Sequence, residues 1–125
     1  MRDERIAIEA AVKIYLDGLY EGNVEKLASV FHATSALTYE EEGGLKVLPR
    51  DEWLSAVSNR PSAQARGLGR SDEILQIDQA SATTAFVKLK CAIPPKFFTD
   101  YLSLLKVEGK WQVAQKVFST EVHHR

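Results

Sequence analysis

Two long strand-like segments joined by a tight turn constrain the fold of this chain most. Residues 97–118 read FFTDYLSLLKVEGKWQVAQKVF, and Glu108-Gly109 separates two alternating runs. This pattern predicts a β-hairpin with a two-residue loop. The loop length sets the register, and the predicted cross-strand pairs are Val107 with Lys110, Lys106 with Trp111, Leu104 with Val113, Leu102 with Gln115 and Asp100 with Val117.

Alternation along the hairpin assigns its side chains to two faces. One face carries the apolar residues Leu102, Leu104, Trp111, Val113 and Val117, and we expect it to face the core. The other carries Thr99, Tyr101, Ser103, Leu105, Gln112, Ala114 and Lys116. Asp100 and Gln115 share the core face, and a carboxylate there needs hydrogen-bond partners, a water-filled cavity or a proton of its own.

Length and charge limit the classes of protein this chain can belong to. We expect its 125 residues to form one domain, residues 1–125, that buries roughly two thirds of its unfolded surface. Sixteen basic and seventeen acidic residues give a net charge of −1, so we expect neither a nucleic-acid nor a membrane partner. The single cysteine, Cys91, cannot form an internal disulfide. No apolar run approaches the roughly 18 residues of a membrane span, and we expect a soluble, cytoplasmic protein.

Apolar spacing predicts three helices in the first half of the chain. A stripe over residues 3–21 predicts the first helix, with Gly22 ending it and Asn23 capping a second. Pro49 begins the third, which ends near residues 59–62. The residues expected to be buried are Ile8, Val12, Tyr15, Leu16 and Leu19 in the first helix, Leu27, Ala28 and Phe31 in the second, and Trp53, Leu54 and Val57 in the third.

Strand patterns account for the rest of the chain. A hairpin around Glu42-Gly43-Gly44 follows the second helix, and residues 68–78 and 84–93 read as two further strands. Pro94-Pro95 interrupts the ladder, so we expect a loop before the long hairpin. Together, the predicted helices and strands indicate an α+β domain with three N-terminal helices on a mostly antiparallel sheet of about six strands.

Several segments resemble the nuclear transport factor 2-like superfamily, and most closely its group labelled "putative lumazine-binding" and SnoaL-like. They are YLDGLYEGN at the end of the first helix, the Phe31-His32 pair, FTDYL at 98–102 and the closing EGKWQVAQKVF. The resemblance implies a cystatin-like, cone-shaped fold in which a strongly curved sheet wraps around the first helix. It also implies a hydrophobic pocket at the wide end and a homodimer.

The resemblance does not select one function. Ketosteroid isomerase, scytalone dehydratase and the cyclase SnoaL share this cone with binding domains that catalyse nothing. Tyr15 aligns with the tyrosine that supplies an oxyanion-hole donor in ketosteroid isomerases. The position of their general-base aspartate falls at or near Tyr39, which argues against steroid isomerisation because proton removal beside a carbonyl needs a base.

The candidate site residues follow from these patterns. Asp100, His32 and Tyr15 are the catalytic candidates, as a poised carboxyl group, a proton relay and a hydrogen-bond donor. Tyr39, Trp53, Gln115 and Phe31 are the ligand-binding candidates, since an aromatic pocket with few polar groups suits a planar ligand. We expect no cofactor and assign no metal site, because the adjacent His123 and His124 point in different directions at a chain end.

Three hypotheses about function remain at this stage. The leading one is a homodimeric domain that binds a small hydrophobic or planar organic ligand. The second is a cofactor-free isomerase, dehydratase or cyclase acting on a hydrophobic cyclic substrate. The third is a protein-interaction domain whose cone is filled by its own side chains. Homodimerisation also follows from Tyr101, Leu105 and Phe118, predicted on the second face of the sheet.

Overall fold

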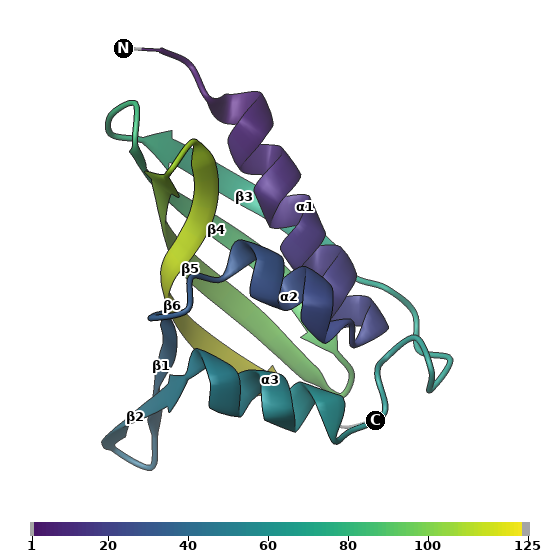
Figure 1. Ribbon diagram of the computed structural model, residues 1–125. Coiled ribbons are helices and arrows are strands. Elements are labelled where there is room, and N and C mark those ends of the chain that lie inside the picture. The colour runs from purple at the N-terminus through teal and green to yellow at the C-terminus, as the bar shows by residue number, and fades with distance from the viewer. Residues whose placement is uncertain (1, 124–125) are drawn as a thin grey trace.

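The computed structural model describes residues 2–123, so His124 of the terminal pair lies outside the described residues. The elements follow in the order α1 (Arg5–Glu21), α2 (Val24–Val30), β1 (Ala36–Glu41), β2 (Gly44–Pro49), α3 (Arg50–Ser58), β3 (Asp72–Gln79), β4 (Thr84–Ile93), β5 (Lys96–Val107) and β6 (Lys110–Val122). The predicted three-helix, six-strand α+β architecture is confirmed. Figure 1 shows the helices on one face of the sheet.

The first two helices meet at the predicted residues. Gly22 ends α1 in the left-handed conformation, with φ of 67°, which glycine adopts at little cost. Asn23 caps α2 because its side chain accepts a hydrogen bond from the Lys26 backbone N–H at 3.1 Å. The bend between the helices is therefore encoded by these two consecutive residues.

The sheet is mixed, with strand order β2-β1-β6-β5-β4-β3. Among the strand pairings of residues 2–123, only β1–β6 is parallel, and the other four are antiparallel. Glu42-Gly43 and Glu108-Gly109 form two-residue turns with positive φ at both positions, as type I′ hairpin turns require. Pro94-Pro95 interrupts the ladder as predicted, and the connection before the long hairpin is a tight turn across which Ile93 pairs with Lys96.

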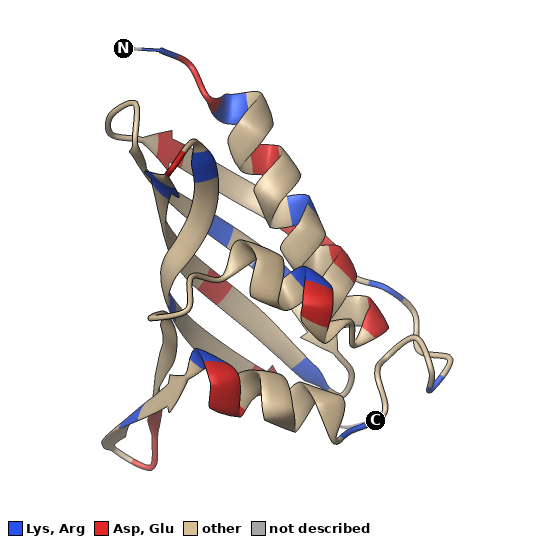
Figure 2. Cartoon of the chain, viewed as in Figure 1, with Lys and Arg blue, Asp and Glu red and all other residues tan. Residues whose placement is uncertain are grey.

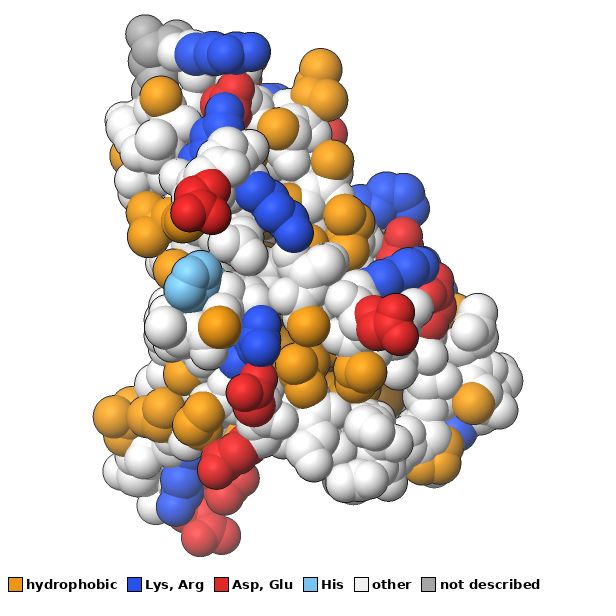
Figure 3. Space-filling view, viewed as in Figure 1, with side chains coloured by type: hydrophobic (Ala, Val, Ile, Leu, Met, Phe, Trp, Pro, Cys, Tyr) orange, Lys and Arg blue, Asp and Glu red, His pale blue; other side chains and the backbone are white. Residues whose placement is uncertain are grey.

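The helices and the sheet enclose one hydrophobic core. The predicted stripe of α1 is buried, as are Leu27, Phe31, Trp53 and Val57 from the other helical segments. The sheet contributes inward-facing side chains from its central strands, and these include Val87 and Leu89 of β4, which are 0 % exposed. Figure 3 shows hydrophobic side chains reaching the surface between α2 and α3.

A β-bulge changes the predicted register in the second half of the long hairpin. Lys106 pairs with Trp111 and Leu104 with Val113 as predicted, but Ser103 then pairs with Gln115, leaving Ala114 as the extra residue. The predicted pairs of Leu102 with Gln115 and of Asp100 with Val117 are therefore wrong. Leu102 lies opposite Lys116, and Asp100 lies opposite Phe118.

The bulge reverses the predicted faces of the residues beyond it, since side chains alternate with a period of two. Lys116, predicted on the outer face, is 5 % exposed, whereas Val117, predicted in the core, is 45 % exposed. Gln115 leaves the core face and hydrogen-bonds Thr38 of β1. Phe118, predicted on the second face, packs against the core.

Charged residues of both signs alternate along the exposed side of α1, as Figure 2 shows. Arg5 pairs with Glu9 at 3.3 Å and Lys13 with Asp17 at 3.4 Å, the spacing at which side chains on a helix surface meet. Within residues 2–123, none of the three helices has the length and apolar character needed to cross a membrane.

Candidate functional site

Asp100 of β5 lies at the centre of a buried polar cluster. Its side chain is 0 % exposed, and its Oδ2 atom accepts a hydrogen bond from the Tyr15 hydroxyl of α1 at 2.5 Å. The thiol of Cys91, on β4, lies 3.7 Å from the same oxygen. The second carboxyl oxygen, Oδ1, is buried without a hydrogen-bond partner among the described residues, which is costly inside a protein.

Lys116 of β6 completes this group, which we call the Asp100 cluster: Tyr15, Cys91, Asp100 and Lys116. Its ammonium group donates a hydrogen bond to the Tyr15 hydroxyl oxygen at 2.8 Å and lies 3.7 Å from Asp100 Oδ2. The hydrogen bonds thus run in one direction, from the Lys116 ammonium group to the tyrosine oxygen and from the tyrosine hydroxyl to the carboxylate.

Aromatic rings surround the ammonium group of Lys116. Its Nζ atom lies 5.2 Å from the ring centre of Tyr15, 5.1 Å from that of Trp53 and 4.8 Å from that of Phe118. These distances are within the range of cation–π attraction, which is strongest where water is excluded. The charge of Lys116 is therefore offset by ring faces as well as by Asp100.

Burial also keeps the Tyr15 hydroxyl and the Cys91 thiol of the cluster protonated. Desolvation, followed by the negative charge of Asp100, raises the pKa of the Tyr15 hydroxyl well above its usual range. The same two causes raise the pKa of Cys91 to about 12. At neutral pH Tyr15 is consequently a hydrogen-bond donor and Cys91 is an unreactive thiol.

The aromatic candidates form two connected groups. The ring centre of Phe31 lies 5.3 Å from that of Tyr15 and 4.8 Å from that of Trp53, and all three side chains are buried. The ring centre of Tyr39 lies 5.0 Å from that of Phe118, and Tyr39 is only half-buried. Tyr15, Phe31 and Trp53 thus fill the centre of the cone, and Phe118 links the Asp100 cluster to the partly exposed Tyr39.

The structure brings Tyr15 and Asp100 together but places two other candidates elsewhere. The His32 ring hydrogen-bonds Thr34 at 2.8 Å, and the Thr34 backbone N–H donates to the same ring nitrogen. Gln115 lies beside Thr38. Lys116 is the member of the cluster that the sequence prediction missed, although a counter-charge is one way to stabilise a buried carboxylate and Lys116 lies on the neighbouring strand β6.

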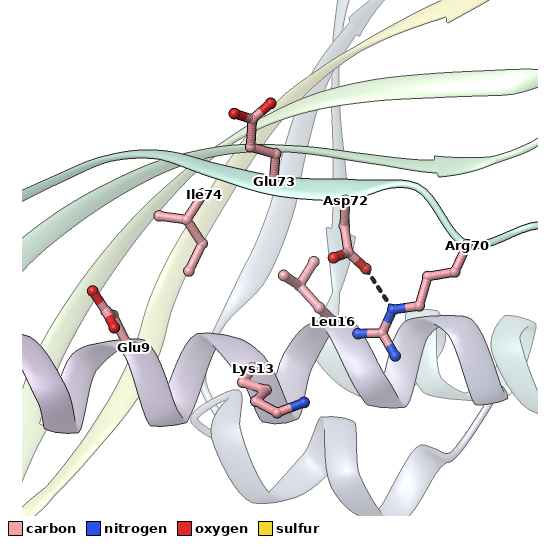
Figure 4. A pocket seen from close by; sticks show the side chains of 7 residues that line it. All are labelled: Glu9, Lys13, Leu16, Arg70, Asp72, Glu73 and Ile74. Carbon is pink, nitrogen blue, oxygen red and sulfur yellow. Dashed lines mark hydrogen bonds and ion pairs between the residues drawn. The ribbon is translucent and has the colours of Figure 1, made fainter.

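An open groove of about 460 Å³ lies between α1 and β3, away from the Asp100 cluster. Leu16 and Ile74 form its apolar part, and charged residues surround them (Figure 4). Arg70 bridges Asp17 and Asp72 at 2.8 Å each, so the charges at this end of the groove satisfy one another. We favour the Asp100 cluster as the functional site because its carboxylate retains an unmet hydrogen-bonding requirement.

Metal binding does not explain the cluster. Within residues 2–123 no group of three or more His, Cys, Asp and Glu side chains could hold a metal ion, and three or four such ligands are usual for a protein metal site. The chemistry available to the cluster is that of a hydroxyl donor, a carboxylate and an amine within 4 Å of one another.

The fold is that of a domain of the nuclear transport factor 2-like class. A solved NTF2-like protein of unknown function from Shewanella baltica superposes with a TM-score of 0.83 and 25 % identity, covering 96 % of this chain and 95 % of that one. A ketosteroid isomerase-like protein from Erwinia carotovora atroseptica gives a TM-score of 0.75 at 20 % identity, covering 98 % and 100 %.

The family is narrower than the fold class. Residues 3–119 match the family described as "Putative lumazine-binding", and the chain belongs to that family. The aldolase FrzH from Cladobotryum sp. is 24 % identical over 114 residues, which cover 90 % of this chain and 87 % of that protein. The resemblance noted in the sequence is thereby confirmed.

Proposed function

We propose that this domain binds a small, planar, mainly hydrophobic organic molecule beside the Asp100 cluster. The observation that carries the proposal is Asp100 Oδ1, a buried carboxyl oxygen without a hydrogen-bond partner within residues 2–123. Such an atom costs about 1–3 kcal/mol. A ligand N–H or O–H group that donates to Oδ1 would recover this energy, so this hydrogen bond would contribute to the binding affinity.

The rings around the cluster support a planar ligand. Trp53, Phe118 and Tyr39 offer faces on which a flat molecule can stack, and Phe118 and Tyr39 are half-buried. We place the entry route at these two rings, because Phe118 lies next to Lys116 and Tyr39 lies next to Phe118. Entry then requires Phe118 and Tyr39 to rotate, since the interior behind them is filled by Tyr15, Phe31 and Trp53.

Lumazine is the first probe to test, because the family description names it and its chemistry suits the site. It is a planar two-ring molecule with carbonyl oxygens, which could accept from Lys116, and N–H groups, which could donate to Asp100 Oδ1. Naphthalene has a similar two-ring outline without polar atoms. The pair therefore separates recognition by the polar cluster from non-specific hydrophobic binding.

The test is a fluorescence titration of the protein with lumazine, compared with naphthalene and with two variants. We expect saturable lumazine binding, weaker binding of naphthalene, and at least a tenfold loss of lumazine affinity in Asp100→Asn. Asp78→Asn, at an exposed position of β3, is the control and should bind as the wild type does. Equal lumazine affinity in all three proteins would contradict a site at Asp100.

Catalysis by the same cluster is the second candidate function. The protonated Tyr15 hydroxyl contacts the Asp100 carboxylate at 2.5 Å. An acid and a base this close together could protonate one atom of a substrate and deprotonate another. The relative named as an aldolase directs attention to substrates that carry a carbonyl group. Loss of turnover in both Tyr15→Phe and Asp100→Asn, with folding retained, would support this role.

We also propose that the outer face of the sheet forms a homodimer interface. Tyr101, Leu105 and Val117 are each more than 40 % exposed on neighbouring strands β5 and β6, and a second copy would bury them. Light scattering after size exclusion should give a dimer that Leu105→Glu converts to a monomer. Leu45→Glu, on β2 and 76 % exposed, is the control that should remain dimeric, and a monomeric wild-type protein would contradict the proposal.

A further inference from the structure

Lys116 is a buried amine held in a fixed position, which is uncommon for a lysine. Its residue is 5 % exposed, three rings surround the Nζ atom, and the only hydrogen bond it donates within residues 2–123 goes to the Tyr15 hydroxyl. An ammonium group has three donor hydrogens, so this one retains unused hydrogen-bonding capacity. Lys116 and Asp100 form an ion pair at 3.7 Å without a direct hydrogen bond between them.

The hydrogen bonds around Lys116 form a path along which it can lose a proton. A proton on Nζ points at the tyrosine oxygen over 2.8 Å, and the tyrosine proton points at Asp100 Oδ2 over 2.5 Å. A concerted shift of both protons leaves a neutral amine, a protonated carboxyl group and an unchanged tyrosine. A neutral lysine amine is a nucleophile, and lysines in hydrophobic surroundings form Schiff bases with carbonyl compounds.

We propose that Lys116 forms a covalent iminium adduct with the carbonyl group of a small hydrophobic aldehyde or ketone. The inference rests on the proposed function, because the carbonyl compound occupies the same site beside the Asp100 cluster. The ligand class is accordingly narrowed from planar organic molecules in general to those with a reactive aldehyde or ketone group near Nζ.

The step balances within the cluster. The neutral amine of Lys116 attacks the carbonyl carbon, a C–N bond forms, and one proton moves from nitrogen to the former carbonyl oxygen. Asp100 then returns its proton to that hydroxyl group, which leaves as water while the nitrogen lone pair forms the C=N bond. The products are a positively charged iminium group and the Asp100 carboxylate, so the net charge equals that of the starting ammonium–carboxylate pair.

Two observations favour this adduct over a passive lysine. The iminium cation would lie where the rings of Trp53 and Phe118 already surround a positive charge. Asp100 Oδ1, without a hydrogen-bond partner within residues 2–123, would be free to accept a proton from the carbon next to the iminium group. Loss of that proton converts the iminium to an enamine, a carbon nucleophile, without any cofactor.

The test is reductive trapping with 2-naphthaldehyde and sodium cyanoborohydride at neutral pH, followed by peptide mapping with mass spectrometry. The hydride reduces the iminium to a stable secondary amine and marks the lysine that formed it. We expect labelling of Lys116 to saturate with aldehyde concentration and to be at least tenfold faster than that of the exposed Lys46 and Lys110. In Lys116→Arg the label on this peptide should disappear.

Lumazine binding, measured in parallel on the same protein, separates the two proposals. Lumazine binding without a Lys116 adduct would overturn the covalent step and leave the ligand site intact. Absence of both would overturn the covalent step together with the proposed site. Labelling of Lys116 no faster than that of Lys46 and Lys110 would show a lysine of ordinary reactivity and would also overturn the inference.

Discussion

Replacing Lys116 with methionine should destabilise the fold strongly, because it leaves the Asp100 carboxylate buried without its counter-charge. The two groups lie 3.7 Å apart, and Asp100 is 0 % exposed. At an effective dielectric constant of about 20, two unit charges at this distance attract by roughly 4 kcal/mol. Removal of one partner from a buried pair costs about 3–5 kcal/mol, so we expect the free energy of unfolding of Lys116→Met to fall by about 4 kcal/mol.

A double-mutant cycle isolates the pair from the packing of the lysine side chain. Asp100→Asn alone should also destabilise, because it leaves the ammonium group among aromatic rings. The double variant should lose about 3 kcal/mol less than the sum of the two single variants, since it buries no uncompensated charge. Lys90→Met, at an exposed position of β4, is the control and should change stability by about 0.5 kcal/mol or less.

Urea unfolding at neutral pH measures these differences through the fluorescence of Trp53 and Trp111. With an m-value of about 2 kcal/mol/M, a loss of about 4 kcal/mol lowers the unfolding midpoint by about 2 M. The reasoning would be refuted if the unfolding midpoint of Lys116→Met lay within about 0.3 M of the wild type and the stability losses of the two single variants added up in the double variant. Asp100 would then not depend on Lys116, and the ion pair would not be the centre of the site.

Three further predictions concern the glycine turn, the thiol and the N-terminus. Gly22→Ala should destabilise the fold by more than Gly67→Ala. Both glycines have φ near 70°, which costs roughly 1–2 kcal/mol for alanine, but only at Gly22 would the new Cβ meet Ser62 Cβ, at 2.8 Å. Thermal unfolding compares the two variants, and equal losses of stability would contradict the clash. Cys91, with its pKa raised to about 12 by burial, should resist iodoacetamide at pH 8 until urea unfolds the protein. The hydrogen bonds from Lys106 and then from Trp111 lower the pKa of Glu4 from its usual range. The stability that Glu4 adds over Glu4→Gln should therefore be full at neutral pH and disappear as the pH falls through that lowered pKa, whereas a pH-independent difference would refute this linkage.

The parts of the fold set by local chemistry were predictable from the sequence. The stripe of α1, the Gly22 stop and the Asn23 cap each depend on neighbouring residues, and the structure has all three. The candidate site was predicted in part for the same reason: Asp100 and Tyr15 lie on faces that simple periodicity assigns correctly. Lys116 was assigned to the wrong face because strict alternation assumes an uninterrupted ladder, and Ala114 breaks it.

That one inserted residue determines the character of both faces of the sheet. Without it, Lys116 would point outward, Gln115 would take a place near Leu102, and Val117 would lie in the core, as alternation predicts. With it, an ammonium group enters the cone beside Asp100, while Val117 joins Tyr101 and Leu105 among the exposed apolar residues. Because a buried ion pair adds little net stability compared with a well-packed apolar core, packing alone does not account for the bulge. The proposed role of Lys116 in binding or chemistry would account for the bulge, and the outward turn of Val117 follows from the same shift in register.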